Sequence, residues 1–463
     1  MKSVLLIDFG STYTKVTAVD VEGERLLGTA QSYTTVQSDI NEGLHNALTL
    51  LEKTTGKLDF AETYACSSAA GGLRMIASGL VPELTSEAAR LASLGAGAKI
   101  VGLYSFQLTE DDLSEIHEAR PDIFLLVGGT DGGNSECILH NARMLATLPP
   151  EFPIVVAGNR TAARECERIL SGWEVHLCEN VMPKFGVLKT EPTQKKIREI
   201  FLSRIIHAKG LSKATSLLSD IMMPTPAAVL QAMGLLADGC ADESGIGELV
   251  GVDVGGATTD IYSIADGAPR QMNTVYKGLP EPYAKRTVEG DIGMRYSIQG
   301  IVDAASLRRV CQLSGLSEDR ALYWIGYLKA HTDAVPADDP ELTALDFALA
   351  SLAIETAVTR HAGTMEETYT MMGQTFVQNG KDLTAVRQIV VTGGSLIHTR
   401  QTVKIASHAL YDPSAPMSLR PRQADIWVDR NYILAAMGLL SGHYPRVALR
   451  IMKKELERNG YSE

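Results

Sequence analysis

The sequence is poor in cysteine: it has six, and no two are spaced as a Cys-x-x-Cys pair. None lies in a Cys/His cluster with the spacing of metal ligands, so a disulfide scaffold and a zinc site are disfavoured, and reduced, buried thiols are expected. Basic residues are also scarce, with 43 Lys and Arg against 55 Asp and Glu and a formal net charge of −12. An acidic chain of this kind lacks the positive surface that binds nucleic acid or anionic membranes.

Long apolar runs and several common motifs are also missing. The apolar run at the start, in MKSVLLIDFG, is too short for a signal peptide and meets Asp8 at once, and no run elsewhere is long enough to span a bilayer. The sequence contains no GxxxxGK(S/T) phosphate loop, no GxGxxG after the first predicted strand and no HExxH. With 463 residues, 45% of them hydrophobic, we expect a soluble, cytoplasmic protein of about two to four domains.

Short β-rich apolar runs alternate along the chain with helical patterns. This alternation is typical of α/β proteins whose sheets are covered on both faces. Strands are predicted, for example, over 4–8, 15–20, 249–254 and 388–392, and helices over 40–52, 227–237 and 345–372. The predicted fold class is therefore α/β.

Three segments of the first half reappear, in the same order, in the second half. The pairs are Leu5–Gly10 with Val250–Gly255, Leu126–Gly129 with Val391–Gly394, and Val229–Leu236 with Ile433–Leu440. One match is worth little, but three in order favour a duplicated lobe with a ligand cleft between the copies. We expect the first lobe at 1–60, an inserted or elaborated α/β subdomain at 61–190, the return of the first lobe with an interdomain helix at 191–244, and the second lobe at 245–463.

The first motif that carries chemistry is Ile7–Lys15, in which an aspartate ends an apolar strand and glycine and hydroxyl residues follow. Backbone N–H groups of such a turn converge on one point and suit phosphate oxygens, and the carboxylate of Asp8 suits a water-bridged Mg2+. Read alone, the motif is equally compatible with an ordinary β-turn. The candidate nucleotide-binding residues are Gly10, Ser11, Thr12 and Lys15.

The second motif, Val252–Asp260, repeats the order of strand, Asp, Gly, hydroxyl residues and new strand. An ordinary turn needs only one such motif, whereas a triphosphate–metal site held by two lobes needs two. The paired occurrence therefore favours nucleotide binding. Asp253 is the second predicted metal ligand and, like Asp8, a candidate catalytic carboxylate. The phosphate-binding candidates in this motif are Gly255, Gly256, Ala257 and Thr258.

The third motif, Ile389–Ser395, leads an apolar strand into Gly393, Gly394 and Ser395. Bare backbone near a helix N-terminus suits a nucleoside, although a tight strand-to-helix turn explains the pattern equally well. Glu289 is a further catalytic candidate. Glu289 and Asp291 are suited to hold the metal or to orient the attacking water, and a contact of Glu289 with ribose is a further alternative. A solvated turn is the alternative for these two carboxylates.

The segment Gly128–Asn134 follows a predicted buried strand and contains four glycines in seven residues. Glycine is costly in backbone entropy, so a special conformation is expected. We interpret it as a loop that contacts nucleotide, metal or a partner, with a complex turn as the alternative.

Together, the Asp8, Asp253 and Gly393–Gly394 motifs and the two Ala-Met-Gly-Leu-Leu helices resemble the five landmark segments of the actin-like ATPase superfamily, which includes sugar kinases, chaperone ATPases and reactivating factors. The resemblance spans residues 8–440. It implies duplicated actin-like (ribonuclease H-like) lobes around a central nucleotide cleft, with ATP or ADP and Mg2+ as cofactors. It does not indicate which task the nucleotide serves.

A closer resemblance rests on Cys66–Met75, Leu126–Asn134, Asn180–Pro183 and Val288–Arg295. These segments resemble signatures of the glutamate mutase accessory protein family (GlmL, also called MutL). The resemblance implies a slow, Mg-dependent ATPase that acts as a chaperone and releases damaged cobalamin from an adenosylcobalamin-dependent mutase. The chain does not look like a cobalamin carrier itself, because the nearest match to DxHxxG is Ile205–Gly210, with Ile in place of Asp and His207 as the histidine.

Two other functions remain open on the same motifs. A small-molecule kinase needs a base for a substrate hydroxyl, for which Asp131 and Glu289 are available, but no sugar-site pattern is recognisable. A nucleotide-dependent filament or scaffold protein needs a repeated apolar surface, and none is identifiable in the sequence.

Overall fold

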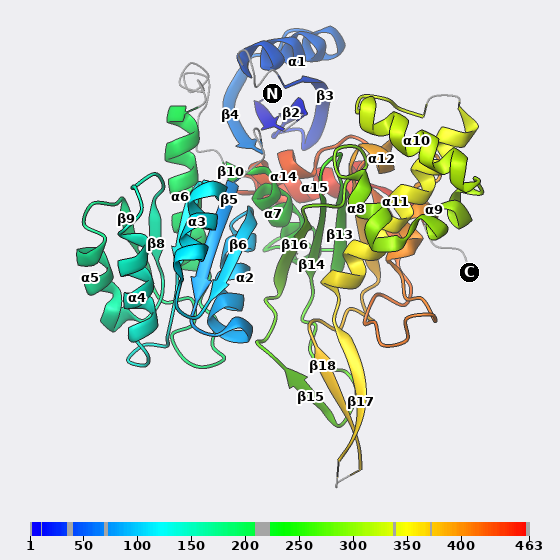
Figure 1. Ribbon diagram of the computed structural model, residues 1–463. Helices are drawn as coiled ribbons and strands as arrows, with labels where there is room; N and C mark the ends of the chain where they lie inside the picture. The colour runs from blue at the N-terminus through cyan, green and yellow to red at the C-terminus, as the bar shows by residue number, and fades with distance from the viewer. Residues whose placement is uncertain are drawn as a thin grey trace. The chain divides into compact units, whose positions relative to one another are not determined.

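The computed structural model describes residues 2–10, 12–34, 40–68, 73–208, 223–336, 339–370 and 373–459. The chain divides into two compact units (Figure 1). The first comprises Met1–Ala232, Gly278–Pro280 and Ala435–Ala448, and the second comprises Met233–Lys277, Glu281–Leu434 and Leu449–Glu463. The domain boundaries expected at 61, 191 and 245 remain predictions.

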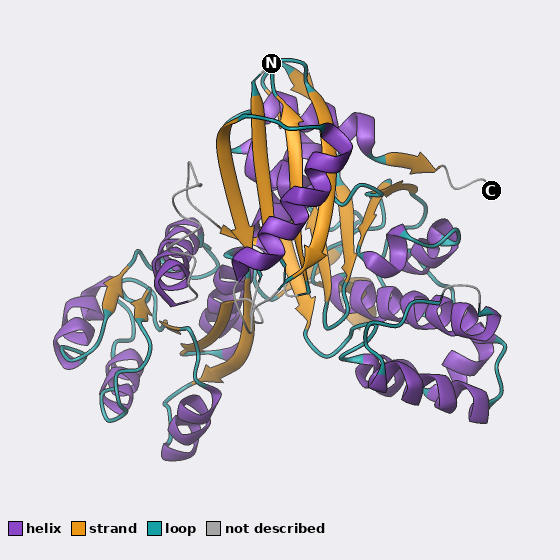
Figure 2. Cartoon of the chain, turned by 90° about the horizontal axis from the view of Figure 1, so that it is seen from above, coloured by secondary structure: helices purple, strands orange, loops and turns teal. Residues whose placement is uncertain are grey.

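The first unit contains a five-stranded sheet of order β10-β4-β1-β2-β3. β1, β2 and β3 form an antiparallel meander, whereas β4 runs parallel to β1 and β10 runs parallel to β4. Helix α1 (Ile40–Thr55) connects β3 to β4 and packs against β2 and β3 (Figure 2). The strands are β1 (Ser3–Phe9), β2 (Tyr13–Asp20), β3 (Arg25–Tyr33), β4 (Phe60–Ser67) and β10 (Met223–Pro224).

The second unit contains a sheet of order β16-β14-β13-β19-β20-β21. Its first five strands repeat the order and directions of the first sheet, because β13, β14 and β16 are antiparallel and β19 and β20 run parallel to β13. The duplication and the α/β class are thereby confirmed. The strands are β13 (Leu249–Val254), β14 (Thr259–Ile264), β16 (Ala284–Glu289), β19 (Gln388–Thr392), β20 (Asp425–Val428) and β21 (Glu457–Asn459).

One of the three sequence pairs does not belong to this duplication. β19 occupies the position of β4, since each lies next to the first strand of its sheet. The segment Leu126–Gly129, which was paired with Val391–Gly394, instead begins at the last residue of β7 (Ile123–Leu126), in a different sheet. The topological counterpart of Thr392 is therefore Cys66, because each pairs with the aspartate of its own hairpin. Two apolar strands that both end in Gly-Gly can thus be similar in sequence although they occupy different positions in the fold.

That different sheet is wholly parallel and has the order β6-β5-β7-β8-β9. Helices follow each of its first four strands and bury apolar side chains on both faces, as expected of a doubly wound sheet. Its elements are β5 (Leu73–Gly79), the π-helical turn Pro82–Ser86, α2 (Glu87–Gly95), β6 (Ala98–Ser105), α3 (Glu110–Ala119), β7, α4 (Glu136–Leu145), β8 (Ile154–Val156), α5 (Arg160–Ile169) and β9 (Val175–Leu177). α6 (Glu191–Ala208) leads back toward β10.

In the second unit, four helices between β16 and β17 (Thr364–Thr370) bury one large apolar core. They are α8 (Ile298–Ala305), α9 (Leu307–Ser314), α10 (Glu318–Ala330) and α11 (Pro340–His361). α11 is long and apolar enough to cross a membrane by length and composition, but 67% of that apolar stretch is buried inside the protein. It is the core helix of this unit, which the search for long apolar runs overlooked.

The helix predicted over 345–372 ends at His361, and residues 364–370 form a strand instead. A Cβ on Gly363 would come within 2.6 Å of the carbonyl oxygen of Asn379, so the chain turns sharply there against a neighbouring strand. The alternating segment Thr364–Thr370 then pairs with β18 (Gly373–Asn379), and β15 (Thr274–Lys277) joins the other side of β18. The predicted helix was therefore too long at its C-terminal end, because the helical pattern was continued past Gly363.

The two repeated helices, α7 (Thr225–Asp238) and α14 (Leu434–Ser441), follow β10 and β20. Gly438 of α14 lies against the backbone of Ala228, where a Cβ would be 1.8 Å from the carbonyl oxygen. The close approach of these helices thus requires glycine at this position. The remaining elements are β11 (Gly239–Cys240), β12 (Glu243–Ser244), α12 (Gly394–Ile397), α13 (Thr402–Ala406), the 3-10 turn Ser407–Ala409 and α15 (Pro445–Glu455).

Candidate functional site

The first candidate motif forms the tight turn between β1 and β2. The N–H of Gly10 donates to the carbonyl of Tyr13 at 3.0 Å. A Cβ at position 10 would lie 2.5 Å from that same oxygen, so only glycine fits. The carbonyl of Thr12 accepts from the N–H of Thr34 at 2.8 Å, which ties the turn to the end of β3. Ser11 lies outside the described residues.

Asp8 is buried at the end of β1, with 6% of its surface exposed. Its register places Lys15 on one side and Cys66 on the other. The Lys15 ammonium is 3.5 Å from Oδ2, the Thr225 hydroxyl donates to Oδ1 at 2.6 Å, and the Cys66 thiol lies 3.5 Å from Oδ1. Burial, and next the charge of Asp8, raise the pKa of the Cys66 thiol well above its usual value, so it stays a protonated donor.

The structure thus adds two residues to the Asp8 site that sequence reasoning missed. Thr225 is the first residue of α7, 217 positions from Asp8, and Cys66 is the last residue but one of β4. The one sequence signal for Thr225 is that a hydroxyl residue stands four positions before the repeated segment Val229–Leu236. Cys66 stands at the start of one of the segments that carry the family resemblance, but only the pairing of β1 with β4 shows that it adjoins the carboxylate.

The second hairpin repeats the first in detail. The N–H of Gly255 donates to the carbonyl of Thr258 at 2.9 Å, matching the Gly10 turn. Asp253 faces Asp260 on β14, seven residues away, as Asp8 faces Lys15. Two turns with the same closing bond and the same spacing from an aspartate show that the duplication extends to the candidate site.

The neighbours of the two aspartates differ in charge. Where the first unit has Lys15, the second has Asp260, which is buried and forms an ion pair with Arg286. Their closest atoms, Nη2 and Oδ1, are 2.6 Å apart. Asp260 is therefore already neutralised by Arg286, whereas Lys15 lies beside Asp8 at the first hairpin.

The segment from Glu289 to Tyr296 packs against the second hairpin. The N–H of Met294 donates to the carbonyl of Gly255 at 3.0 Å, and the N–H groups of Arg295 and Tyr296 donate to that of Gly256 at 2.9 Å. These bonds fix the outer carbonyls of the turn and explain why Val288–Arg295 accompanies the Asp253 motif. Glu289 itself is paired with Arg360, and Asp291 is exposed.

The third motif lies beside the second hairpin within the same unit. Gly393 has a φ of 105°, and a Cβ there would lie 2.3 Å from the carbonyl oxygen of Val254. This glycine therefore lets the β19 turn touch the end of β13, directly before Gly255. Gly394 is exposed with open space beside it, and the buried hydroxyl of Ser395 has no hydrogen-bond partner among the described residues.

Asp429, another residue missed from sequence, supports this turn from the position directly after β20. Its carboxylate accepts from the Thr392 hydroxyl at 3.1 Å and from the N–H groups of Ile433 and Leu434 at 2.8 and 3.2 Å. It thus caps α14 and fixes the end of β19 at the same time.

Each unit gathers its own predicted residues. The first unit joins Asp8 to the Gly10 turn and Lys15, and the second joins Asp253 to the Gly255–Thr258 turn and the Gly393 turn. In the part of the chain that the structure describes, no three His, Cys, Asp or Glu side chains cluster as a metal cage. The roles of these residues in binding remain predictions.

The Gly128–Asn134 loop is held by two buried asparagines. Asn159 accepts from the N–H of Gly132 at 3.0 Å and donates to the carbonyls of Gly133 and Asn134. Asn180 donates to the carbonyl of Gly129 and to the carboxylate of Asp131, each at 3.0 Å. The loop has a special conformation, as its glycine content predicts, and it lies at the carboxyl end of β7. Its contact with a ligand remains a prediction.

Comparison with known proteins gives one family and one close relative. The model of the family described as "MutL protein" matches residues 4–456. The protein named "Protein MutL" from Clostridium tetanomorphum is 47% identical over 460 residues, which cover 98% of this chain and 99% of that protein.

Solved structures give weaker likenesses. The 2-hydroxyisocaproyl-CoA dehydratase activator from Clostridium difficile with bound ADPNP has a TM-score of 0.33 and 9% identity, covering 99% of this chain and 100% of that one. Component A of (R)-2-hydroxyglutaryl-CoA dehydratase from Acidaminococcus fermentans has the same two values, with 97% and 100% covered. Xylulose kinase from Lactobacillus acidophilus has a TM-score of 0.36 and 10% identity, with 99% and 93% covered. TM-scores this low do not establish a shared fold.

Proposed function

Because the chain belongs to the MutL family, the glutamate mutase accessory family, we propose that it is an ATP-dependent reactivating factor for an adenosylcobalamin-dependent mutase. An accessory role follows from the family itself. The finer role, release of damaged cobalamin driven by ATP hydrolysis in the cytoplasm, is the proposal. It is supported by the two equivalent acidic hairpins.

Nucleotide binding is supported by backbone N–H groups that lie near each aspartate and have no hydrogen-bond acceptor among the described residues. Among the described residues, the N–H groups of Thr12, Gly256 and Ala257 donate no hydrogen bond. They lie in the turns that follow Asp8 and Asp253. Backbone N–H groups in turns of this kind can bind an anion, which suits phosphate oxygens.

The residues also fit a hydrated Mg2+ in place of a protein cage. Mg2+ commonly binds to one or two carboxylates, water and substrate phosphates, so the absence of a larger acidic cluster in the described residues is consistent with it. Asp8 and Asp253 would hold the ion through water, and bound Mg2+ would neutralise charge on the phosphates. Thr225 orients the Asp8 carboxylate, and Lys15 adds positive charge beside it.

The remaining candidates have supporting parts in the proposal. In the turn of Gly393, Gly394 and Ser395, Gly394 leaves open space and the Ser395 hydroxyl has no partner among the described residues, which suits the nucleoside. Glu289 is kept as a candidate for positioning the attacking water, and release from Arg360 would free its carboxylate. Loss of the terminal phosphate would then weaken the nucleotide's hold on the two hairpins and change the affinity for the mutase.

The experiment is a phosphate-release assay with purified glutamate mutase subunits, with and without inactivated cobalamin. Partner-stimulated, Mg-dependent release and recovery of mutase activity are expected. Asp8→Asn and Asp253→Asn should each abolish hydrolysis while leaving the chain folded, because Asn keeps the shape of the side chain and loses its charge. Wild-type turnover in both variants would refute the metal assignment. ATP-dependent phosphorylation of a small hydroxylated metabolite without any mutase would favour the kinase alternative.

A further inference from the structure

β15, β17 and β18 form a sheet of the second unit that no helix covers in the described part of the chain (Figure 1). We call this sheet the arm. Gln378 is its only buried side chain among those described. Small sheets without a covered hydrophobic face are marginally stable in water, so the arm depends on its base or on a partner for stability.

Aromatic side chains gather on one face of the arm. Register pairing and the two-residue period of strands place Tyr276, Met365, Tyr369 and Phe376 on the same face. Tyr369, the last residue but one of β17, is 77% exposed. Exposed apolar side chains of this size gather at interaction surfaces.

The outer edge of β17 is open along most of its length. The N–H of Met365 points outward and donates to the carbonyl of Met417 at 2.8 Å. By the two-residue period, the N–H groups of Glu367 and Tyr369 also point outward, and neither donates a hydrogen bond to another described residue. Open edge groups of this kind pair readily with a further strand.

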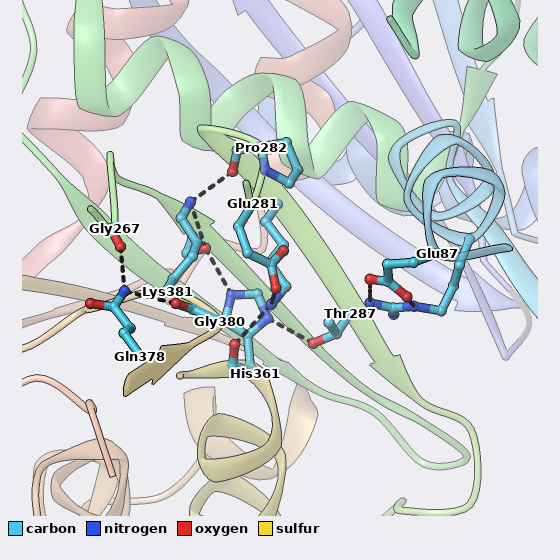
Figure 3. Close-up of polar contacts among 12 residues, drawn as sticks. Glu87, Gly267, Glu281, Pro282, Thr287, His361, Gln378, Gly380 and Lys381 are labelled. Atoms are coloured by element: carbon cyan, nitrogen blue, oxygen red, sulfur yellow. Dashed lines mark hydrogen bonds and ion pairs between the residues drawn. The ribbon is translucent and has the colours of Figure 1, made fainter. Parts of the chain in front are cut away.

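Buried polar side chains fix the base of the arm (Figure 3). Gln378, near the end of β18, donates to two backbone carbonyls at 2.9 and 2.8 Å. Lys381 donates to two more at 2.9 and 2.7 Å and lies 3.3 Å from the Ser263 hydroxyl. His361, just before β17, contacts the hydroxyls of Ser263 and Thr287 at 2.8 and 2.7 Å. The edge is thus held in place before any partner binds, which lowers the entropic cost of docking.

The charges on β17 discriminate between occupants. Its only ionisable acidic groups are the exposed Glu366 and Glu367, which point to opposite faces. Pairing two copies of this edge would bring four carboxylates within a few residues of one another, which is unfavourable. A strand with Lys or Arg opposite these positions is favoured instead.

We propose that the outer edge of β17 docks an extended, basic strand of the partner enzyme by β-strand addition. The identity of the partner rests on the proposed function, whereas the edge, its charge and its anchoring come from the arm alone. The aromatic face then covers apolar side chains of the docked segment, and the salt dependence of binding reports Glu366 and Glu367.

The test measures binding of the full-length protein to purified glutamate mutase subunits by calorimetry. The double variant Glu366→Lys with Glu367→Lys is expected to weaken binding at least tenfold and to leave basal phosphate release unchanged. The matched control, Glu118→Lys with Asp303→Lys, makes the same change in net charge at two exposed helix positions and is expected to bind normally. Equal binding by the two double variants would overturn the proposal.

Two further measurements do not depend on charge. Tyr369→Pro removes an outward N–H and is expected to weaken binding. The variant should still fold, because the hydrogen bonds between β17 and β18 do not use this N–H. A photo-crosslinking benzoylphenylalanine at position 369 should capture a mutase subunit, and the same probe at Tyr323, which is 55% exposed on α10, should not.

The outcomes separate this inference from the proposed function. If the wild-type protein reactivates the mutase and the arm variants do so equally well, the docking edge is wrong and the function stands. If the wild-type protein binds no mutase subunit, both are overturned. If light scattering shows that the arm variants lose a wild-type dimer, the occupant is a second copy and the proposal is refuted.

Discussion

Lys381 makes the stability of the second unit depend on pH in a measurable way. The side chain is fully buried, and burial, with the charge of Lys285 next, lowers its pKa from 10.5 to about 7. Between these values the unfolded chain binds a proton that the folded chain does not. Stability therefore rises with pH from about 7 toward 10.5, and this gain is absent below the folded pKa.

The magnitude follows from the shift. Each pKa unit corresponds to about 1.4 kcal/mol, and at pH 7 half of the folded molecules still carry the proton. Raising the pH from 7 to 9 should therefore stabilise the unit by about 2 kcal/mol through this one group. Tyr262 and Tyr283, whose pKa values are raised by burial, act in the opposite direction at still higher pH, so the measurement stops at pH 9.

The assay is urea unfolding at pH 7, 8 and 9, followed by tryptophan fluorescence. A Trp173→Phe background leaves Trp324 and Trp427, both in the second unit, as reporters. In Lys381→Met the rise of about 2 kcal/mol should disappear, whereas Lys329→Met, at an exposed lysine, should retain it. An equal pH slope in the two variants would refute the assignment of a neutral, buried Lys381.

Three further predictions concern the candidate site. Gly393→Ala should destabilise the second unit by about 1–3 kcal/mol in urea unfolding, because residue 393 has a positive φ and its Cβ would strike the backbone of β13. Gly394→Ala, which has open space, should lower the free energy of unfolding by less than about 1 kcal/mol. The variant Gly256→Val should fold normally, since a Cβ at this position meets nothing closer than 3.6 Å. Its side chain should block the approach of phosphate and lower the nucleotide affinity measured by calorimetry. Unchanged affinity would show that this turn is not part of the site. Thr225→Val should remove the donor to Asp8 and weaken Mg2+-dependent nucleotide binding about tenfold, with Thr225→Ser restoring it.

Local patterns predicted the hairpins well because each is a local structure. A strand, an aspartate and a glycine that only a tight turn accommodates determine their own geometry within ten residues. The same reasoning failed at 364–370, where helical periodicity was read through Gly363 into a strand. Strand pairing with β18, which no local window contains, decided that segment.

The sequence by itself determined the α/β class, the duplication of the Asp–Gly hairpins and the family. These properties depend on residues close together in the chain or on similarity along its length. Only the tertiary structure decided that Thr225 and Cys66 adjoin Asp8, that β19 corresponds to β4, and that Lys381 is buried beneath an open-edged arm. Each of these depends on which distant strands pair, and pairing is set by the packing of the whole sheet, to which any single segment contributes only a part.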